Sequence, residues 1–553
     1  MKLLKALVIF AVVSVVIGCQ QKDSLQLKIV DDIEQRVAKF AEVDITADVS
    51  FLPENEQQAL HKIIEASRYM QDIFDRQVWQ GNPELLEKLR HARSPKEKAA
   101  LAYFKIMSGP WDRLLSEQPF VGETEKPHGA GYYPVDMSKD EFEKYTATVT
   151  EEERNQLMGL CTIVSREGEK LVATPYSQVY KQWLEPAAAL LKEAAELTEN
   201  ASLQDFLLKR ANAFLSDDYY ESDMAWMDID SPVEVTIGPY EVYEDALFGY
   251  KAAFESFVTV ADPEASEKLA IYKSWLPKME ANLPIPDAMK NFERGSESPI
   301  RVVDEVFTAG DTRSGIQTIA FNLPNDERVR EAKGSKKVIL RNVLMAKYDK
   351  ILQPIAERFV DESQLQHLSS EAFTNNVLFH ELSHGLGPGK IMKDGKETEV
   401  RFELKDLYST CEEAKADVMG IYNILFMQEN EVMPPSKFET TAVTYLAGLF
   451  RSVRFGATEA HGRGVALQIN YMLEKGAISL DEASGKFTVN FDKYPDVIRD
   501  LVRDLCILQA YGDYEGTKQL FDKYATLDTR LAQRLESLTD IPVDIAPRYP
   551  LAE

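Results

Sequence analysis

The sequence predicts a mixed α+β fold that is mostly helical and has two lobes around a cleft. Amphipathic stretches rich in Ala, Leu, Glu and Lys occupy both ends of the chain, while β-branched and turn residues concentrate over residues 232–260 and 299–344. The length of 553 residues also exceeds that of one ordinary domain. We therefore expect one lobe with a small β-barrel or sheet and a second lobe that is all-helical.

The N-terminal residues read as a secretion signal. Two lysines precede an apolar run over residues 6–17, which is shorter than the roughly 20 residues that a membrane-spanning helix needs. The letters VIGC at residues 16–19 resemble the bacterial lipobox. We expect residues 1–19 to be a lipoprotein signal peptide, Cys19 to carry a lipid anchor and residues 20–30 to form a tether. An uncleaved signal anchor and an ordinary secretory signal are the alternatives.

This leader predicts a lipid-anchored bacterial envelope protein, on the periplasmic side or at the outer membrane. The chain carries 63 Lys and Arg against 90 Asp and Glu, a formal net charge of −27. Such a charge repels phosphates and anionic lipid head groups, so nucleic acid is excluded as an expected partner. Contact with a membrane is expected through the anchor only. The sequence makes no prediction of oligomeric state.

Residues 31–344 are predicted to form the mixed α/β lobe. Helical spacing is clearest over residues 55–76, 95–106 and 186–197. Four later segments read as strands and are expected to carry substrate-binding residues: VEVTIG from residue 233, RVVDEVF from 301, TIAFNL from 318 and KKVIL from 336.

Residues 345–553 are predicted to form the helical lobe. Residues 265–292, between the two groups of strands, also look helical and are a candidate to pack with this lobe. A turn-rich break falls at residues 387–396. The Pro-rich end, residues 541–553, is predicted to be an extended tail that packs on the surface or frays.

Three cysteines follow Cys19, namely Cys161, Cys411 and Cys506. Their number is odd and none has CxxC spacing, so neither a disulfide framework nor a cysteine zinc site is indicated. One disulfide between two of them and simple burial of each thiol are both open.

The most informative motif is HExxH, formed by His380, Glu381 and His384. Histidines at i and i+4 lie on one face of a helix, so both imidazoles can bind one metal ion. We expect Ser370 to cap this helix and Gly385 to help end it. Glu381 lies where its carboxylate can take a proton from a water, which is the general-base position of a zinc hydrolase.

A catalytic zinc usually has three protein ligands, and the sequence offers a third on a second helix. Residues 409–412, Ser-Thr-Cys-Glu, form a capping-box pattern that predicts a helix start. Glu413 and Asp417 then share a helix face, so Glu413 can bind zinc while Asp417 accepts the ring N–H of a histidine. The alternative is a solvated acidic helix N-terminus.

These motifs and their order resemble the dipeptidyl peptidase III family of zinc exopeptidases, over roughly residues 230–480. In that family, a His-Glu zinc motif is followed by a helix of the type Glu-Glu-x-x-Ala-acid, which residues 412–417 match. The resemblance implies that Glu413 is the ligand and that Glu412 and Asp417 are partners of the histidines.

Further segments extend the resemblance. Glu459-Ala460-His461, with LQINYMLE after it, is similar to the family segment that stabilises the transition state, which implies that His461 donates to the oxyanion. Without the resemblance, the sequence would favour a histidine on a helix surface, or one in the core whose ring nitrogens are hydrogen-bonded.

Three segments resemble family segments that bind substrate. Residues 237–245, IGPYEVYED, imply that Glu241 holds the substrate amino terminus and that Tyr243 polarises the scissile carbonyl. Residues 322–325, NLPN, followed by residues 342–344, imply that Asn322 and Asn325 bind substrate backbone and amine. Without the resemblance, these residues would be routine strand and turn residues.

Two features depart from the family pattern. The dipeptidyl peptidases have one more residue between the zinc histidines, His-Glu-x-x-x-His, and their chains are longer. The sequence looks closer to a divergent bacterial branch, related to the peptidase-like part that is fused to Nudix hydrolases in plants. It contains no Nudix box.

We therefore expect a zinc metallopeptidase that hydrolyses oligopeptides near their amino terminus, with one Zn²⁺ per chain. Zinc would be bound by His380, His384 and Glu413, and Glu381 would be the general base. Two alternatives stay open at this point. One is a zinc hydrolase of another amide or an ester, and the other is a surface binding protein without activity.

Overall fold

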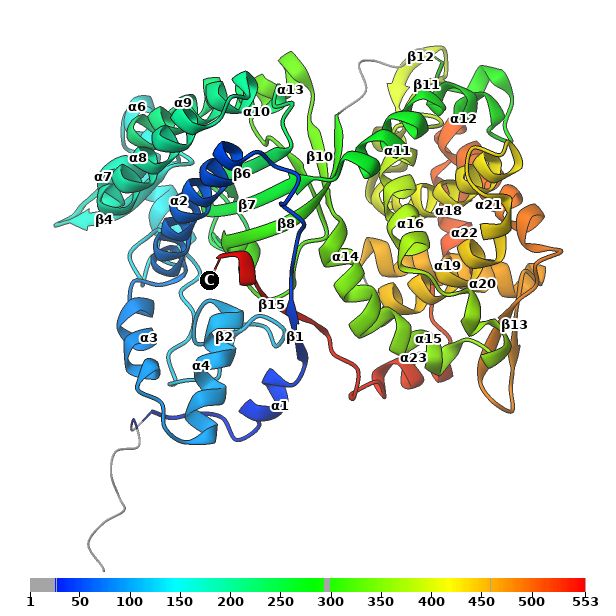
Figure 1. Cartoon of the computed structure of the whole chain (residues 1–553), viewed down its shortest axis with the longest axis horizontal. Coiled ribbons are helices and arrows are strands. Elements are labelled where there is room, and N and C mark those ends of the chain that lie inside the picture. Colours follow the sequence, from blue (N-terminus) through cyan, green and yellow to red (C-terminus); the bar gives the residue numbers. More distant parts are fainter. Residues whose placement is uncertain (1–24, 26, 293–298, 458, 553) are drawn as a thin grey trace, which may run out of the picture. The chain divides into compact units, whose positions relative to one another are not determined.

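The computed structural model describes residues 25, 27–292, 299–457 and 459–552 (Figure 1). The predicted signal peptide and the anchor position Cys19 lie outside the described residues. Near the end of the predicted tether, Val30 N donates to Phe120 O and Gly122 N donates to Lys28 O, so this part packs against the fold. Among the described residues, no helix combines the length and the apolar character that crossing a membrane requires.

The chain forms two compact units. Unit 1 comprises residues up to 38 with residues 74–173 and 242–251, and unit 2 comprises residues 39–73, 174–241 and 252–553. The predicted lobe boundary after residue 344 falls within unit 2 and stays a prediction.

Unit 1 is built mainly from short helices and hairpins. Its segment 242–251 is held by buried charges. Glu244 pairs with Arg113 and Lys126, and Lys251 donates to backbone carbonyls at and just after the end of α6, Leu157 O and Gly159 O. The elements of this unit are α1 (Ile33–Val37), α3 (Asn82–Arg90), α4 (Pro95–Met107), β2 (Trp111–Asp112), β3 (Gln118–Pro119), α5 (Lys139–Thr146), α6 (Glu151–Leu157), β4 (Thr162–Glu167) and β5 (Lys170–Pro175), whose end reaches unit 2.

Unit 2 contains a five-stranded mixed sheet in the order β6-β7-β8-β10-β9. All four strand segments predicted from the sequence lie in it. Strand β10 runs parallel to β8 and antiparallel to β9. The bounds of the strands are β6 (Val233–Glu241), β7 (Ala253–Ala261), β8 (Ile300–Gly310), β9 (Ala320–Leu323) and β10 (Lys336–Leu340).

The sheet is strongly curled. Phe257 on β7 and Phe321 on β9 stack with ring centroids 4.2 Å apart, although two strands separate them in the sheet. In a flat sheet, strands three positions apart would stand about 14 Å from each other. At one end of the curl, Asn325 Nδ2, just after β9, donates to Tyr240 O at the end of β6. The ends of the two edge strands therefore meet.

Helices α8 and α9 run alongside each other next to the sheet (Figure 1). Arg210 of α9 is fully buried and donates to Ile237 O and Tyr240 Oη on β6, and it pairs with Asp223 of α10. These contacts fix the strand end that carries Glu241. The helices of this part are α2 (Glu54–Val78), which continues into unit 1, α7 (Tyr176–Val179), α8 (Lys181–Leu197), α9 (Ala201–Ser216), α10 (Tyr220–Met227) and α13 (Glu327–Lys333).

The segment predicted as helix over residues 265–292 forms α11 (Pro263–Ser274) and α12 (Leu276–Asn282), and then breaks except for one 3₁₀ turn, η1 (Asp287–Met289). The helix α12 ends at Asn282 because Pro284 and Pro286 follow closely. Tyr272 packs on Phe379 at 5.2 Å, and Glu280 Oε2 accepts from Gly387 N. The segment therefore packs against the helix that carries the HExxH motif.

The C-terminal part of unit 2 is a helical assembly in which α18 contacts α16, α19, α20 and α21. The turn-rich break at residues 387–396 closes as a hairpin with β12. The elements are α14 (Arg341–Lys347), η3 (Tyr348–Leu352), α15 (Gln353–Phe359), η4 (Glu362–His367), α16 (Ser370–Ser383), β11 (Lys390–Lys393), β12 (Lys396–Glu399), α17 (Val400–Leu404), η5 (Lys405–Leu407), α18 (Tyr408–Glu429), α19 (Phe438–Val453), α20 (Ala460–Lys475), β13 (Ile478–Asp481), β14 (Lys486–Val489), α21 (Tyr494–Tyr511), α22 (Tyr514–Tyr524) and α23 (Thr529–Glu536).

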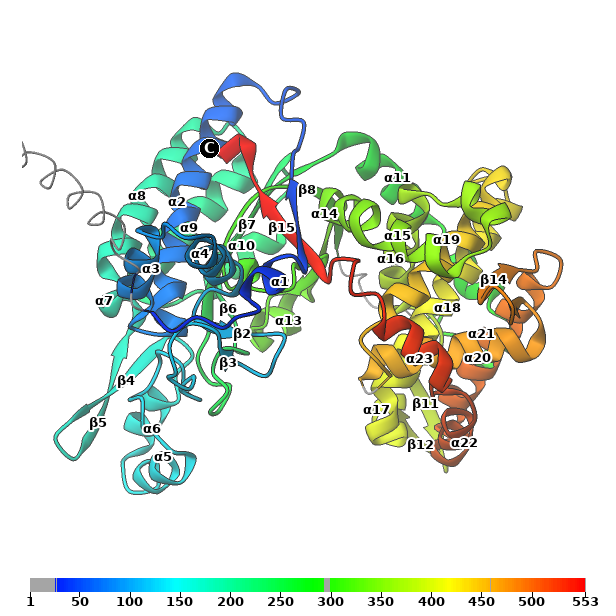
Figure 2. The same ribbon diagram turned by 90° about the horizontal axis from the view of Figure 1, so that it is seen from below.

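The C-terminal tail does not fray. Strand β15 (Asp544–Arg548) pairs in parallel with β1 (Phe40–Asp44), and Figure 2 shows the red last strand beside the blue first one. Lys347 of α14 forms a buried ion pair with Asp544. The predicted extended conformation of the tail is confirmed, and the alternative of a frayed end is wrong, because pairing with β1 and a buried salt bridge hold this segment. The prediction of a mostly helical α+β fold is confirmed.

Candidate metal centre

Helix α16 presents the two histidines of the HExxH motif one turn apart. Its N-cap is Ser369, whose hydroxyl accepts from Ala372 N, so the cap lies one residue before the predicted Ser370. The last helical residue is Ser383, and His384 is the C-cap, still in helical conformation. Both imidazoles therefore keep the spacing of a helical turn.

Helix α18 supplies the acidic residues. It starts at Tyr408, directly after the 3₁₀ turn η5, and its N-cap Leu407 has no side-chain cap hydrogen bond. The predicted capping box at residues 409–412 is therefore wrong, because the backbone is already helical before Ser409. Gly420 lets α18 approach α16 closely: a Cβ there would lie 2.9 Å from His380 N.

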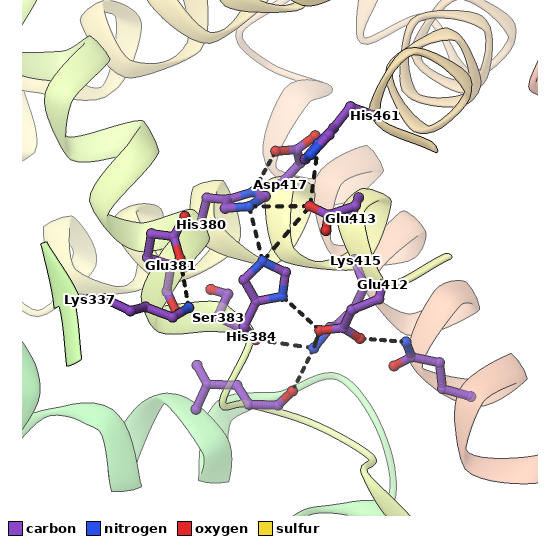
Figure 3. Close-up of polar contacts among 12 residues, drawn as sticks. Lys337, His380, Glu381, Ser383, His384, Glu412, Glu413, Lys415, Asp417 and His461 are labelled. Carbon is purple, nitrogen blue, oxygen red and sulfur yellow. Dashed lines mark hydrogen bonds and ion pairs between the residues drawn. The ribbon is translucent and has the colours of Figure 1, made fainter. Parts of the chain in front are cut away.

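Three ligand-type atoms converge between these helices (Figure 3). The Nε2 atoms of His380 and His384 are 3.1 Å apart, and Glu413 Oε2 lies 3.4 Å from the first and 3.8 Å from the second. Tetrahedral zinc ligands at about 2.0–2.1 Å from the ion stand about 3.3 Å from one another. Glu413 Oε2 is buried and has no hydrogen-bond partner among the described residues. The donor set and its spacing fit a zinc ion.

Two carboxylates fix the orientation of the imidazoles. His380 Nδ1 lies 2.7 Å from Asp417 Oδ1, and His384 Nδ1 lies 2.9 Å from Glu412 Oε1. A protonated Nδ1 donates in each pair, which leaves the two Nε2 lone pairs facing each other. A cation between them is the natural partner for this arrangement.

The carboxylates are themselves held. Gln468 Nε2 of α20 donates to Asp417 Oδ2, and Gln509 Nε2 of α21 donates to Glu412 Oε2. Lys415, almost fully buried, donates to Glu412 Oε1 and also to two carbonyls at and just after the end of α16, Ser383 O and Leu386 O. Because an ammonium group has three donors and here has three acceptors, its burial leaves no donor unused.

The acidic groups around the two histidines favour a positive charge between them. Burial alone lowers the pKa of His380, but Asp417, Glu413 and Glu381 outweigh it and raise this pKa to about 10. For Glu412, burial raises the pKa, while Lys415 and His384 outweigh it and lower the pKa to about 2. Without a metal ion, the acidic groups therefore favour a protonated His380, and a bound metal cation would take the place of that proton.

Glu381 points to the other side of the histidines and meets a lysine from the sheet. Lys337 Nζ of β10 lies 2.6 Å from Glu381 Oε2. Burial raises the pKa of Glu381, but Lys337 and the histidines outweigh it and lower the pKa below its usual value. The carboxylate is therefore ionised at neutral pH, as a general base must be.

His461 lies at the edge of the same cluster, on the first turn of α20. Its Nδ1 is 3.4 Å from Glu413 Oε2, and its side chain is 68% exposed. The structure therefore brings His461 to the metal group and leaves most of its ring open to a ligand.

The predicted substrate-binding residues lie along the sheet edges. Asn325 Nδ2 lies 3.4 Å from Glu241 Oε1. Burial raises the pKa of Glu241 above its usual value, and the hydrogen bond from Asn325 offsets only part of this effect. Asn322 is exposed on the edge strand β9, directly opposite Lys337 on β10. Tyr243 belongs to unit 1, where its side chain is 82% exposed, and its role stays a prediction.

Several residues at the site are not among those predicted. Lys415 has a signal in the sequence, since it lies three residues after Glu412 on the same helix face. Gln509 and Lys337 have none, because each reaches the site from a distant element. Glu255 on β7 is buried, and burial with the charges of Asp311 and Glu241 raises its pKa well above the usual value. It lies near Glu241 because β7 pairs directly with β6 in the sheet.

Comparison with known proteins identifies the family. The model of peptidase family M49 matches residues 133–445, more than half of the chain. Nudix hydrolase 3 of Arabidopsis thaliana is 37% identical over 575 residues, which cover 94% of this chain and 74% of the plant protein. This match agrees with the predicted relation to plant Nudix fusions.

Two solved structures are similar over nearly the whole chain. The structure of DPP III from Caldithrix abyssi has 50% identity and a TM-score of 0.89, and the match covers 94% of this chain and 99% of that one. The structure of dipeptidyl-peptidase III from Corallococcus sp. strain EGB has 42% identity and a TM-score of 0.75, with 94% and 97% covered. The predicted resemblance is confirmed: the chain belongs to peptidase family M49 and is a metallopeptidase of the dipeptidyl peptidase type.

Proposed function

We propose that the protein is a zinc-dependent exopeptidase that releases dipeptides from the amino terminus of oligopeptides. The observation that carries this proposal is the convergence of His380, His384 and Glu413 on one point, with Glu381 on the same helical turn. A binding protein has no physical need for a carboxylate general base beside such a group. Membership of family M49 supports the peptidase part of the proposal.

In this proposal, the zinc ion is held by Nε2 of His380, Nε2 of His384 and a carboxylate oxygen of Glu413. When bound, zinc supplies Lewis-acid chemistry, which lowers the pKa of a water and polarises a carbonyl. Glu412 and Asp417 keep both Nδ1 atoms protonated, so that both Nε2 lone pairs point at the ion.

The proton transfers fall to Glu381. Its ionised carboxylate takes a proton from the attacking water and then delivers this proton to the leaving amine of the scissile peptide bond. His461 is proposed to donate a hydrogen bond to the oxyanion, and its exposed ring beside Glu413 supports this role. Tyr243 is proposed as a second donor on the basis of the family resemblance.

The amino terminus of the peptide is proposed to bind at the sheet. The carboxylate of Glu241 would pair with the α-ammonium group, and Asn325, which contacts Glu241, would hold this carboxylate in place. Asn322, exposed on β9, would bind the substrate backbone. A fixed anchor for the ammonium group places cleavage at a fixed distance from the amino terminus.

Mass-spectrometric product analysis tests this proposal. The zinc-loaded protein is incubated with free and N-acetylated oligopeptides, with Glu381→Gln as the control. We expect dipeptides from free peptides only, and a loss of at least about 100-fold in kcat for Glu381→Gln with zinc retained, because general-base catalysis is removed.

Other outcomes would redirect the assignment. Equal cleavage of free and N-acetylated peptides would contradict the role of Glu241. Stoichiometric zinc with no peptide cleavage would overturn the peptidase proposal and favour a different amide or ester substrate, or a binding role.

A further inference from the structure

Strand β10 carries two consecutive lysines whose side chains take different partners. Lys336 is buried and pairs with Glu234, beneath the ring of Trp226. Lys337 points to the other face, because side chains alternate along a strand, and there it reaches Glu381 of α16. One lysine is thus used to hold the sheet together, while the other leaves the sheet for the HExxH helix.

Lys337 makes two contacts with the same residue. Its Nζ lies 2.6 Å from Glu381 Oε2 and 3.2 Å from the carbonyl oxygen of Glu381. This carbonyl is in the last turn of α16, where carbonyls lack partners inside the helix and a cation is favoured. Both side chains are only about one-fifth exposed, at 17% and 21%, so solvent screens the pair weakly.

These contacts restrict Glu381 to one arrangement. A glutamate side chain has several rotamers, and fixing it in one of them costs conformational entropy. The contacts of Lys337 with Glu381 offset this cost. With Oε2 bound to the ammonium group and the backbone carbonyl bound to the same group, Oε1 is the oxygen left for proton transfer. Among the described residues, Lys337 makes no such contact with the three metal-ligand side chains.

The strand pair that carries Lys337 also carries a proposed substrate contact. Asn322 on β9 and Lys337 on β10 are opposite each other in the antiparallel register, so their side chains share one face of the sheet. The same two-stranded segment therefore contacts the general base and carries the residue proposed to bind the peptide backbone.

We propose that Lys337 is a positioning residue, which orients the carboxylate of Glu381 relative to the substrate held on β9. This inference rests on the proposed function for its kinetic consequences. Its structural consequence, a fixed Glu381 side chain, is independent of the substrate.

The kinetic test compares Lys337→Met, Lys337→Arg and the full-length wild type, each loaded with zinc. Lys337→Met removes the charge at nearly constant side-chain length. We expect kcat to fall roughly 10- to 100-fold, as it does when other residues that orient groups at a metal site are replaced, while KM changes by less than about threefold. Lys337→Arg keeps a cation and is expected to restore kcat to within about threefold of the wild type. Bound zinc per chain stays at the wild-type level.

Lys393→Met is the matched control. Lys393 also pairs with a glutamate, Glu403, at 2.9 Å, and donates to a backbone carbonyl, Gly512 O, but on the β11 hairpin. The Lys393→Met variant measures the effect of losing a lysine ion pair away from the site, and we expect its kcat to equal that of the wild type. A Lys337→Met variant with wild-type kcat, or one whose loss of activity follows loss of zinc, would overturn the proposal.

A crystal structure of zinc-loaded Lys337→Met gives a readout that needs no substrate. The proposal expects the Glu381 carboxylate to be displaced or to occupy more than one rotamer, with the histidines unchanged. A single wild-type position of Glu381 in this variant would refute the positioning role. If the wild type cleaves no peptide, the proposed function fails by itself, and this crystal structure still decides the role of Lys337.

Discussion

Asp417 and Glu412 each accept a hydrogen bond from one histidine of the metal group, but they are supported differently. Glu412 is bound by Lys415 and Gln509, so its charge has a buried counter-ion. Asp417 is bound by the neutral amide of Gln468. The orientation of His380 therefore depends on the charge of Asp417 itself.

This difference gives a prediction for Asp417→Asn, which keeps the side-chain shape and removes the charge. We expect zinc affinity to fall roughly 10- to 100-fold, because the imidazole loses the partner that fixes its Nδ1 proton. Competition with a metal chelator measures the affinity. Asp406→Asn is the control, since Asp406 accepts from Tyr514 on the surface just before α18. Equal affinities for both variants and the wild type would show that Asp417 does not support the ligand.

At the scale of elements, the site depends on the close contact of α16 and α18. Gly420 lies where α18 crosses the backbone of α16, so that added atoms would meet His380 N and Phe379 C at 2.9 and 3.0 Å. Both are backbone atoms, which cannot move aside as a flexible side chain can. This contact sets the distance of Glu413 and Asp417 from the histidines.

We predict that Gly420→Ala destabilises the protein by about 1–3 kcal/mol, because one added methyl group overpacks the interface, and that it also weakens zinc binding. Urea unfolding and chelator competition measure the two effects. Gly448→Ala on α19 is the matched control, since a Cβ at Gly448 meets no atom within 4 Å and alanine favours helix by about 1 kcal/mol. Equal stabilities of the two variants would contradict this explanation.

At the scale of the whole molecule, the C-terminal end of the described chain is anchored on the sheet. Beyond β15, Tyr549 Oη donates to Glu305 Oε1 of β8 and lies 2.7 Å from Thr308 Oγ1. Glu305 is buried, and burial raises its pKa to about 7, although Tyr549 and nearby cations lower it. The C-terminus is thus anchored on a carboxyl group that titrates near neutral pH.

This anchor predicts a pH dependence of stability. The pKa of Glu305 is raised in the folded state, so its contribution is complete below the unfolded value of 4.5 and is lost as pH rises to about 7. The stability of the wild type relative to Glu305→Gln should fall by about 3 kcal/mol between pH 4.5 and pH 8. Denaturant unfolding of both proteins at several pH values measures this. A constant difference across this range would show that Glu305 does not titrate with folding.

Strands and helix ends can be predicted from short stretches of the sequence, but not equally well. The strands β6, β8 and β10 were predictable because their β-branched residues disfavour helix and suit a pleated sheet, and β9 was predictable because Thr318 and Ile319 directly precede it. Helix ends were predicted less well: the caps at Ser370 and Ser409 were misplaced, since several serines and threonines near each start can serve as caps and the preceding turn decides among them.

The sequence by itself determined the metal group. His380 and His384 are four residues apart on one helix, and Glu413 and Asp417 are four residues apart on another, so helical periodicity alone groups each pair. The part of Glu412 came from the family resemblance. Only the tertiary structure decided how the sets combine and what supports them. Lys337, Gln468 and Gln509 reach the site from other elements, and the curl of the sheet, with the C-terminal strand beside β1, depends on contacts far apart in the chain. Local periodicity carries no information about such contacts, because they arise only when side chains pack.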